Sequence, residues 1–456
     1  MREKIKKMIP QPLFALAEGC SAPLYLVGGS VRDALAGLTS SSTQKDWDIC
    51  SPMPLHEFLE IAEKTEFSVR SVFKNTGTVK LCDKNGAEYE YCSFRSDRYV
   101  RGQHVPTEIF FTNDITVDAR RRDFTANAVY FDIKAGTFVD PLNGITAIQE
   151  KRLSTVAPSE KVFGEDGLRL MRLARFAGTL GFSPDAECLM GAKNNASLIR
   201  DITPERIYTE LSAILSADKK YGIAGGHYHG LKVLEETEVL AHILPELTLG
   251  KGMVQRADFH KYDMLEHSLR AVYYADESVR LAALLHDIGK PFCSLRDGNV
   301  HAHPTEGARI TKEVLLRLKA PKKLIQRIPA LVELHMHDFD CHTKEGKLKR
   351  FFVEHYPLLD DLLKLKQADF SACMDDTSSA PTCVRWESLL NELKTEGAPL
   401  TLKELSLSGK DLLDIGISPP RVSALLQKLL LHAVCNPTEN RKERLLKLAL
   451  SFDKTF

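Results

Sequence analysis

A glycine turn followed by the start of a helix is the first feature of this chain that could do chemistry. A run of strand-forming residues ends at Val27, Gly28 and Gly29 follow, and a helix-like pattern begins at Ser30. The N–H groups at a helix N-terminus carry partial positive charge, and glycine lets an anion approach the main chain closely. The turn is therefore a candidate phosphate site, beside which Arg32 would add a cation.

Two aspartates follow a short distance along the chain. Asp46 and Asp48 flank Trp47 in a predicted strand, and residues two apart in a strand project from the same face. An Asp-x-Asp pair alone is more often an exposed strand edge than a metal site. Next to a candidate phosphate site, however, the pair indicates transfer of a nucleotidyl group, with Asp46 and Asp48 as its catalytic, metal-binding residues.

Three consecutive arginines, which end with Arg121 and Arg122, precede the next candidate residues. Asp123 and Asn127 follow them, at the start of a strand predicted over 128–133. A run of arginines is most often solvated or faces RNA, and a triphosphate clamp is the minority interpretation. Asn127 favours the clamp, because a polar residue at an apolar strand start could bind a sugar hydroxyl.

Four charged residues recur every third position in a helix predicted over 165–180: Asp166, Arg169, Arg172 and Arg175. Residues three apart in a helix differ by about 60° in their angle around the helix axis. These four residues therefore form a stripe that slants across roughly half the circumference. One interpretation is a surface helix with i,i+3 ion pairs. The other is a nucleobase reader, because a carboxylate and a guanidinium can present acceptor and donor edges to a base.

The elements that position these residues form two regions, and 456 residues are enough for roughly two to four domains. Strand-like runs before residue 150 predict strands over 25–27, 77–82, 88–94 and 128–133. Beyond residue 150, helical patterns lie near 165–180, 203–216, 264–290, 306–319, 322–337, 357–371, 385–394 and 420–450. The predicted fold class is α+β, a small α/β head followed by an elongated all-helical body. We predict a head over 1–150, a helical neck over 151–235, a central helical domain over 250–375 and a C-terminal helical tail over 385–456.

Composition excludes several classes of protein. The charges of the 61 basic and 61 acidic residues cancel, so any contact with nucleic acid must come from local basic patches. Ten scattered cysteines without a Cys-x-x-Cys pair predict reduced thiols. Pro10 and Pro12 interrupt the apolar stretch after the basic N-terminus, and no apolar run approaches membrane-spanning length. We expect a cytoplasmic protein with no membrane partner.

Four motifs stand in order along the chain: Gly-Gly-x-Val-Arg-Asp, Asp-x-Asp, Arg-Arg-Asp-Phe-Thr-x-Asn-Ala and Glu-Asp-x-x-Arg-x-x-Arg-x-x-Arg-Phe. Together they resemble the class II tRNA nucleotidyltransferase (CCA-adding enzyme) and bacterial poly(A) polymerase family. The resemblance covers about residues 20–215, and a weaker similarity spans 407–419. It implies a nucleotidyltransferase head like that of DNA polymerase beta.

The resemblance also implies roles for the motif residues. Asp46 and Asp48 would bind two Mg²⁺ ions, which would activate the RNA 3′-hydroxyl and neutralise the triphosphate. Nucleotide-binding residues would be Gly28, Gly29 and Arg32 at the triphosphate, Arg121, Arg122, Asp123 and Asn127 at phosphate and ribose, and Asp166, Arg169, Arg172 and Arg175 at the base of CTP or ATP. Glu88 or Glu90 is a candidate third carboxylate.

Residues 93–106 resemble the flexible loop that members of this family need for adding the terminal A. Members that add only CC lack the loop, so its presence argues against a CC-only enzyme. Gln103-His-Val-Pro106 stands where the family commonly has Arg-x-Pro.

A second set of candidate metal ligands lies on apolar helices of the central domain: His267, His286, Asp287 and Asp369. A single His-Asp pair says little, and a buried histidine is more often simply hydrogen-bonded. The set of four resembles the HD phosphohydrolase domain, with accessory histidines at 303 and 335. The resemblance implies a divalent transition metal or Mg²⁺, which would lower the pKa of a water that attacks a phosphoester. Phosphatase and 2′,3′-cyclic phosphodiesterase activities would follow.

We therefore expect a CCA-adding tRNA nucleotidyltransferase that uses CTP, ATP and the tRNA 3′ end, with an HD phosphohydrolase side activity. The motifs do not separate CCA addition from poly(A) polymerisation or from addition of the terminal A alone. An interpretation of another class is an HD phosphohydrolase whose head only binds RNA.

Overall fold

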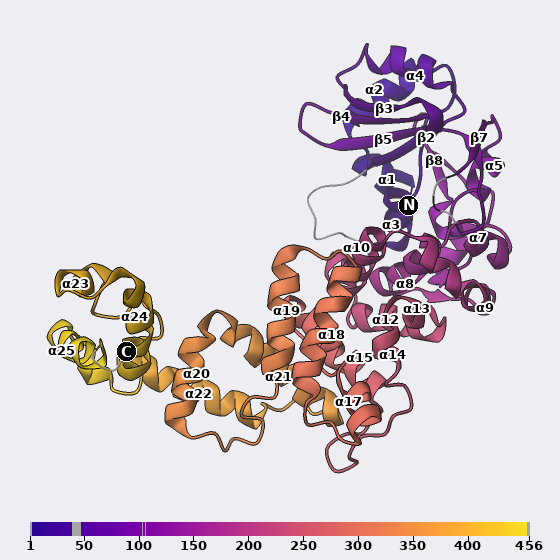
Figure 1. The fold of residues 1–456 in the computed structure, drawn as a ribbon. Helices are drawn as coiled ribbons and strands as arrows, with labels where there is room; N and C mark the ends of the chain where they lie inside the picture. Colours follow the sequence, from indigo (N-terminus) through magenta and orange to yellow (C-terminus); the bar gives the residue numbers. More distant parts are fainter. Residues whose placement is uncertain (1, 39–46, 103, 105, 454–456) are drawn as a thin grey trace. The chain divides into compact units, whose positions relative to one another are not determined.

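The computed structural model describes residues 2–38, 47–102, 104 and 106–453 (Figure 1). The chain forms two compact units, Met1–Thr248 with Val314–Ala320, and Leu249–Glu313 with Pro321–Phe456. No helix among the described residues is long and apolar enough to cross a bilayer.

The head in the first unit is built on a mixed sheet with the strand order β3-β4-β5-β2-β1-β8-β9. Its strands are β1 (Tyr25–Leu26), β2 (Trp47–Ser51), β3 (Ser68–Phe73), β4 (Thr78–Cys82), β5 (Glu88–Ser93), β8 (Tyr130–Asp132) and β9 (Thr137–Val139). Strands β2 and β5 pair in parallel and the other neighbours pair antiparallel. A separate hairpin joins β6 (Arg95–Arg98) to β7 (Glu108–Phe111), and β10 (Arg152–Leu153) pairs with β11 (Ser183–Pro184).

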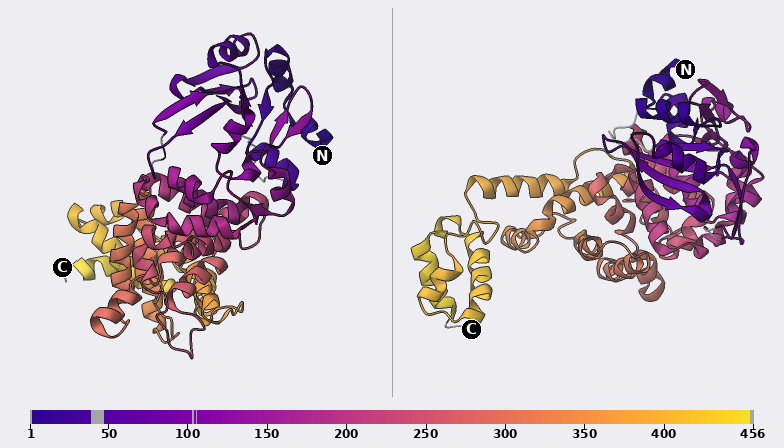
Figure 2. Two further views of the ribbon diagram at one scale, coloured as in Figure 1. Left: turned by 90° about the vertical axis from the view of Figure 1, so that its right-hand side faces the viewer. Right: turned by 90° about the horizontal axis from the view of Figure 1, so that it is seen from above.

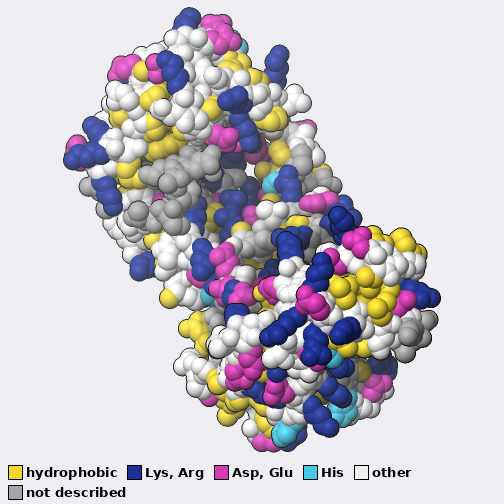
Figure 3. Space-filling view, turned by 90° about the vertical axis from the view of Figure 1, so that its left-hand side faces the viewer, with side chains coloured by type: hydrophobic (Ala, Val, Ile, Leu, Met, Phe, Trp, Pro, Cys, Tyr) yellow, Lys and Arg dark blue, Asp and Glu magenta, His cyan; other side chains and the backbone are white. Residues whose placement is uncertain are grey.

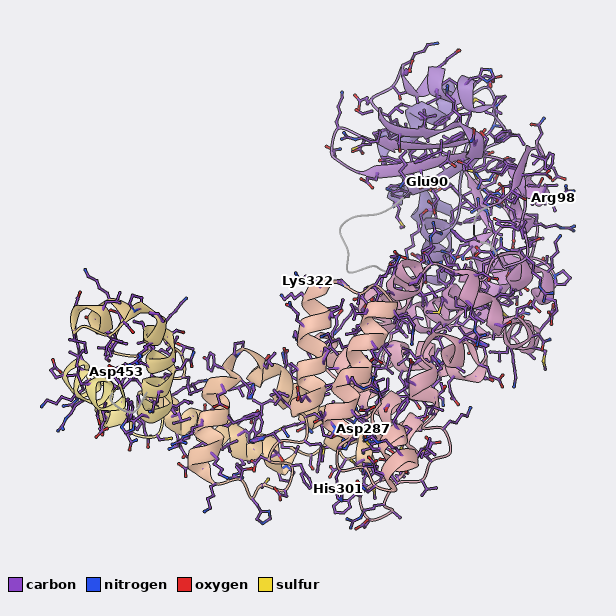
Figure 4. All side chains as sticks on the ribbon, in the orientation of Figure 1. Glu90, Arg98, Asp287, His301, Lys322 and Asp453 are labelled. Atoms are coloured by element: carbon purple, nitrogen blue, oxygen red, sulfur yellow. The ribbon has the colours of Figure 1, made fainter. Side chains whose placement is uncertain are left out.

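Helices cover one face of this sheet. The helical segments of the head are α1 (Arg2–Met8), α2 (Gln11–Gly19), α3 (Gly29–Ala36), α4 (Leu55–Ala62), η1 (Lys74–Thr76), α5 (Ile115–Arg120), η2 (Thr125–Asn127) and α6 (Gly144–Gln149). Figure 1 shows α2 and α4 on the same side of the sheet. Tyr91 of β5 stacks on Phe58 of α4 with ring centroids 3.5 Å apart. Because strand side chains alternate, Glu90 projects from the opposite face (labelled in Figure 4).

The rest of the first unit is a helical neck centred on α8. Its helices are α7 (Ser159–Glu165), α8 (Leu168–Leu180), α9 (Ala186–Asn194), η3 (Ala196–Asp201), α10 (Pro204–Leu215), α11 (Ala217–Tyr221), α12 (Gly226–Glu236), α13 (Val239–Ile243) and α14 (Pro245–Thr248). Most side chains of α8 are buried. Gly178 and Gly226 let α8 and α12 approach closely, because a Cβ at either would lie within 2.4 Å of the other's carbonyl oxygen.

The second unit is helical. Its elements are α15 (Met264–Tyr274), η4 (Glu277–Val279), α16 (Arg280–Leu285), α17 (Lys290–Asp297), α18 (His303–Arg317), α19 (Lys322–Leu334), α20 (Glu345–Glu354), η5 (Tyr356–Leu358), α21 (Leu359–Met374), α22 (Pro381–Thr395), α23 (Gly409–Asp414), α24 (Pro419–Ala433), η6 (Pro437–Glu439) and α25 (Lys442–Asp453). The last residues of α18 belong to the first unit. The C-terminal helices α23, α24 and α25 pack as a small bundle, drawn in yellow in Figure 2.

The predicted fold class is confirmed, and two of the predicted helical stretches each contain more than one helix. The segment 264–290 is broken at Ala275, which is extended, with a ψ of 141°. The segment 420–450 is broken at Pro437, since proline cannot continue a helix. Strand β3 and the hairpin of β6 and β7 were not predicted, because their exposed side chains show little apolar alternation.

Candidate active sites

The glycine turn lies directly beside a carboxylate of the sheet. Gly28 caps α3 with a φ of 74°, and a Cβ at this position would lie 2.9 Å from Asp48 Oδ2. Only glycine suits this position, because both the backbone conformation and the neighbouring carboxylate exclude a side chain. The Ser30 hydroxyl is buried and has no hydrogen-bond partner among the described residues. The sequence reasoning did not single out Ser30, which is the variable residue of its motif.

Asp48 has a carboxylate neighbour on the next strand. In the parallel pairing of β2 and β5, Asp48 stands opposite Glu90, and both side chains are exposed on the same face. Strands are about 4.8 Å apart, so the two carboxylates can share an ion. Oxygen ligands of this kind suit Mg²⁺. Asp46 lies outside the described residues, and Glu88 stands opposite Cys82 of β4.

A chain of hydrogen bonds runs from the glycine turn to the neck. Arg32 is 4% exposed and donates to Asn127 Oδ1 at 2.6 Å. Asn127 donates to Asp123 Oδ1 at 2.9 Å, and Arg172 of α8 donates to Asp123 Oδ2 at 2.6 and 2.8 Å. Burial disfavours the charged form of Asp123, but Arg172 and Asn127 hold its pKa below the ordinary value. Asn127 lies in the turn η2 and not in a strand.

The same series of hydrogen bonds extends to the other side of Arg32. Its guanidinium donates to Asp33 Oδ1 at 2.6 and 2.9 Å, and Tyr221 of α11 donates to Asp33 Oδ2. Phe176 lies between three guanidiniums, with the Arg32, Arg172 and Arg175 carbons 5.1, 5.2 and 4.4 Å from its ring centre. The phosphate turn of the head is thereby held in register with helices of the neck.

Two of the predicted nucleotide ligands are bound instead to a buried aspartate. Arg121 Nε lies 2.7 Å from Asp118 Oδ1, and Arg122 Nη2 lies 3.1 Å from Asp118 Oδ2. Tyr130 also donates to Asp118, at 2.7 Å. Burial would raise the pKa of Asp118, but the two arginines outweigh it and lower the pKa from 3.8 to about 2. This cluster stabilises the base of the head, and the sequence reasoning did not single out Asp118.

Asp118→Asn is expected to lower the free energy of unfolding at pH 7 by about 3 kcal/mol, because it removes the nearest carboxylate of two largely buried guanidiniums and leaves Arg121 only Asp97, at 3.8 Å. The folded-state pKa lies below the unfolded value, so the contribution is present above about pH 4 and is lost as the pH falls toward 2. Urea unfolding across this pH range measures the difference. Glu108→Gln, which breaks an exposed pair with Arg98, is the control and should change stability by less than about 1 kcal/mol. Equal effects of the two substitutions would contradict the prediction.

The residues of the predicted base reader do not form a stripe on one helix. Asp166 lies outside α8, in an extended residue between α7 and α8, and its Oδ1 accepts the backbone N–H of Leu168 at 2.9 Å. Its neighbour Gly167 lies against the Leu198 carbonyl, which leaves no room for a Cβ there. Helix α7 ends at Glu165 and Asp166 itself is extended, so this acidic side chain and the three arginines do not share one helix.

The three arginines of α8 also have different partners. Arg169 donates to the backbone carbonyls of Val162 and Arg121, at 3.0 and 2.8 Å. Arg175 binds Glu210 of α10 at 2.6 Å. Of the three, Arg172 alone joins the hydrogen-bond chain described above, whereas Arg169 lies next to Asp166, with Nε 4.0 Å from its Oδ2.

The loop between β6 and β7 contacts this region at three points. Gly102 donates to Gly164 O at 2.8 Å and accepts from Gly167 N at 3.3 Å, so it is bonded to both sides of Asp166. The Arg169 guanidinium lies 5.6 Å from the centre of the Tyr99 ring. The Nδ1 atom of His104 lies 2.9 Å from Asp166 Oδ2. Figure 3 shows lysine and arginine side chains gathered in a hollow of one face.

In the second unit, the four predicted ligands converge in the interior. His267 comes from α15, His286 and Asp287 follow α16, and Asp369 lies on α21. Nε2 of His267 lies 3.0 Å from Asp369 Oδ1, 3.2 Å from His286 Nε2 and 3.4 Å from Asp287 Oδ2. Nε2 of His286 lies 3.3 Å from Asp287 Oδ2 and 3.4 Å from Asp369 Oδ1. Ligands roughly 2.1 Å from one ion stand about 3.0 to 3.4 Å apart, so the set fits a metal.

The other oxygen of Asp287 faces the accessory histidines. Oδ1 lies 3.3 Å from His303 Nε2 and 3.6 Å from His335 Nε2, and these two nitrogens are 3.3 Å apart. Asp287 is 3% exposed and is labelled in Figure 4. It therefore stands between two ligand clusters, one at each of its oxygens.

The charges of this centre are those of a cation site. Burial disfavours an imidazolium, yet Asp287 and Asp369 raise the pKa of His286 from 6.5 to about 10. Lys290 Nζ lies 2.6 Å from Asp287 Oδ2 and pairs with this carboxylate. A divalent ion would satisfy both carboxylates. The tight turn after Asp287 requires Gly289, since a Cβ there would lie 2.3 Å from the His303 carbonyl oxygen.

Solved structures share this architecture. The crystal structure of the Bacillus stearothermophilus CCA-adding enzyme in complex with CTP matches with a TM-score of 0.65 at 24% identity, over 98% of each chain. The Thermotoga maritima CCA-adding enzyme complexed with tRNA-CCA matches with a TM-score of 0.60 at 18% identity, also over 98% of each chain. The chain therefore has the fold of the CCA-adding enzymes.

Sequence comparisons identify the family. The family models "Poly A polymerase head domain", "Probable RNA and SrmB-binding site of polymerase A" and "HD domain" match residues 24–154, 181–249 and 264–361. An A-adding tRNA nucleotidyltransferase of Deinococcus radiodurans is 32% identical over 429 residues, which are 89% of this chain and 90% of that protein. A multifunctional CCA protein of Stenotrophomonas maltophilia is 31% identical over 329 residues, 69% of this chain and 76% of that one. The chain belongs to the tRNA nucleotidyltransferase and poly(A) polymerase family, and it is a nucleotidyltransferase.

Proposed function

We propose that this enzyme builds and repairs the 3′-terminal CCA of tRNA from CTP and ATP without a nucleic-acid template. The observation that carries the proposal is the placement of Asp48 beside both the Gly28 turn and Glu90. A hydrogen-bond chain through Arg32, Asn127 and Asp123 joins this site to Arg172. Such a site holds a triphosphate against metal-binding carboxylates and next to a base reader.

Each group of residues has a role in this proposal. Asp46, Asp48 and Glu90 would hold Mg²⁺, which when bound favours ionisation of the RNA 3′-hydroxyl and neutralises the triphosphate. Gly28, Gly29 and Ser30 would bind the phosphates through backbone N–H groups and the free hydroxyl. Arg32, Asp123 and Asn127 orient the ribose and the phosphates, with Arg172 behind them. Arg121 and Arg122 act indirectly, since Asp118 holds both.

Asp166 and Arg169 are the proposed base readers. Cytosine and adenine both present an amino group beside a ring nitrogen, which an acceptor and a donor on adjacent residues can match. The base would displace His104 from Asp166. The loop that carries His104 supports addition of A as well as C, because it is fastened on both sides of the reader through Gly102.

Asp166→Ala is expected to relax the preference for CTP and ATP over UTP and GTP by about tenfold or more, because a good bidentate pairing with a base gives about 1 to 3 kcal/mol of discrimination. The KM for the triphosphate should change little, since the phosphate ligands lie on other elements. Single-nucleotide incorporation with each of the four triphosphates measures this. Glu236→Ala, an exposed residue at the end of α12, is the matched control. Equal loss with all four nucleotides would refute the reader role.

A second candidate function is addition of the terminal A alone. Its support is the name of the Deinococcus radiodurans relative, an A-adding tRNA nucleotidyltransferase. The alignment with this chain covers 90% of that relative's length. Poly(A) polymerisation uses the same chemistry and is a third outcome.

One experiment separates these functions. The purified enzyme is incubated with Mg²⁺, with tRNA that ends before CCA or after CC, and with labelled CTP and ATP separately and together. Growth of the first tRNA by three nucleotides that stops at CCA supports the proposal. Incorporation of A only into tRNA that already ends in CC assigns A addition, and a long ladder of A assigns poly(A) polymerisation.

We also propose that the second unit is a metal-dependent phosphohydrolase that acts on phosphate ends or 2′,3′-cyclic phosphates of nucleotides and RNA. His267, His286, Asp287 and Asp369 would hold one divalent ion, and Asp287 Oδ1 with His303 and His335 would hold another. Mixed nitrogen and oxygen ligands suit Mn²⁺, Ni²⁺, Co²⁺ or iron. The bound ion supplies an ionised water, and Lys290 is placed to bind the phosphate.

The site of action we propose is the cytoplasm. All ten cysteines are free, which is typical of proteins in a reducing compartment.

A further inference from the structure

A cysteine and a histidine stand beside the HD centre without a role in either activity proposed above. Cys373 lies one helical turn after Asp369 on α21, and His260 precedes α15. Lys261 N donates to Cys373 O at 2.9 Å, which fixes the His260 segment against the end of α21. The Cys373 sulfur and one imidazole nitrogen each of His260 and His267 lie within 4.8 Å of one another. The two histidine rings meet edge to face, with centroids 4.8 Å apart.

The imidazoles of this group have unsatisfied nitrogens, unlike the other histidines of the centre. Nδ1 of His286, His303 and His335 lies 2.6 to 2.8 Å from the backbone carbonyls of Ala283, Val300 and Val332, the usual second contact of a metal-binding histidine. Nδ1 of His267 and Nδ1 of His260 are both buried and have no hydrogen-bond partner among the described residues. His267 itself is 0% exposed.

We propose that Cys373, His260 and His267 bind a soft divalent ion, Zn²⁺ foremost, at a site that shares His267 with the HD centre. A thiolate with two imidazoles is a preferred ligand set for zinc, and water can complete a tetrahedron. The carboxylate-rich set of His286, Asp287 and Asp369 suits harder ions. Binding requires the Cys373 thiol to lose its proton to solvent, and His267 must also release its Nδ1 proton when the HD ion holds Nε2.

Sharing of His267 couples the two sites. An ion at Cys373 either withdraws electron density from the His267 imidazole or removes His267 from the HD centre, which depends on this ligand. Zinc therefore inhibits the phosphohydrolase, and the inhibition depends on Cys373. This consequence rests on the proposed phosphohydrolase function, whereas the metal site itself does not.

The test is a titration of the full-length, metal-depleted enzyme with Co²⁺, which reports a sulfur ligand through a thiolate-to-cobalt charge-transfer band in the near ultraviolet. We expect this band in the natural enzyme, its displacement by Zn²⁺, and its loss in Cys373→Ser. Cys341→Ser is the matched control, because Cys341 is a thiol of the same half-buried class whose sulfur lies 3.7 Å from Thr382 Oγ1. The control should keep the band. His260→Asn should weaken zinc binding by at least about tenfold.

Absence of the band in the natural enzyme, or its survival in Cys373→Ser, would overturn the site. Manganese-supported hydrolysis of a 2′,3′-cyclic nucleotide is measured on the same samples. Cys373→Ser should keep this hydrolysis and lose at least about tenfold in its sensitivity to zinc. A band without hydrolysis under any metal would refute the phosphohydrolase and leave the zinc site standing.

Discussion

Asp48→Asn is expected to reduce nucleotide addition at least about a thousandfold, with little change in tRNA binding. The substitution removes a negative charge from the pair formed with Glu90, and that pair is the described part of the carboxylate set that would hold Mg²⁺. Metal stabilisation of a triphosphate transition state contributes several kcal/mol, and each 1.36 kcal/mol is a factor of ten in rate. Single-turnover extension of tRNA lacking CCA measures the loss.

Two controls make this experiment specific. Glu66→Gln changes an exposed carboxylate of the same head, paired with Lys84, and should leave addition unchanged. Glu90→Gln should reduce addition by a similar factor to Asp48→Asn if the two carboxylates share an ion. Asp48→Asn should also keep full phosphohydrolase activity. Unchanged RNA end-processing in Asp48→Asn would instead favour an HD phosphohydrolase whose head only binds RNA.

Asp287→Asn is expected to remove the phosphohydrolase activity, again by at least about a thousandfold, and to leave nucleotide addition within about twofold. Asp287 reaches both ligand clusters, since Oδ2 faces His267 and His286 and Oδ1 faces His303 and His335. An amide keeps the shape of the side chain but offers one oxygen and no charge. Metal content by mass spectrometry and hydrolysis of a 2′,3′-cyclic nucleotide with Mn²⁺ measure the two losses.

Asp340→Asn is the control for this change, because it removes an exposed carboxylate of the same unit. Asp287 is also paired with buried Lys290, so its removal can destabilise the second unit. Asp369→Asn provides a second variant, with a side chain 25% exposed, and should give the same loss. Full hydrolysis in both variants, with normal metal content, would contradict the assignment of the centre.

The arrangement of α8 shows where sequence periodicity stops being informative. The three-residue spacing predicted that Asp166 shares one helix with Arg169, Arg172 and Arg175. In the structure α7 ends before Asp166, and Gly167 lies against the Leu198 carbonyl. A helical pattern records which positions are apolar, and a packing contact with a distant segment is not part of that pattern. The break moves Asp166 away from the helix axis and toward the loop of His104.

The arginines illustrate the same limit for charge. Arg121, Arg122 and Arg172 look alike as charged residues of motifs, but the first two bind Asp118 and the third binds Asp123. Asp118 precedes the motif by only a few residues and carried no signal, since an aspartate in a helix pattern is usually exposed. Its burial depends on Tyr130 and on the whole base of the head.

By itself the sequence determined the family, the α+β class and the residue types of both centres, because glycine turns and carboxylate or histidine ligands are set by local chemistry that few other residues can provide. Only the tertiary structure decided which of these residues meet. Glu90 was distinguished from Glu88 by the register of two strands, and Asp287 was placed between two histidine clusters by the packing of four helices. Such contacts join segments as far as 102 residues apart. They follow from the burial of apolar faces, and the sequence shows which residues form each face but not which faces pack together.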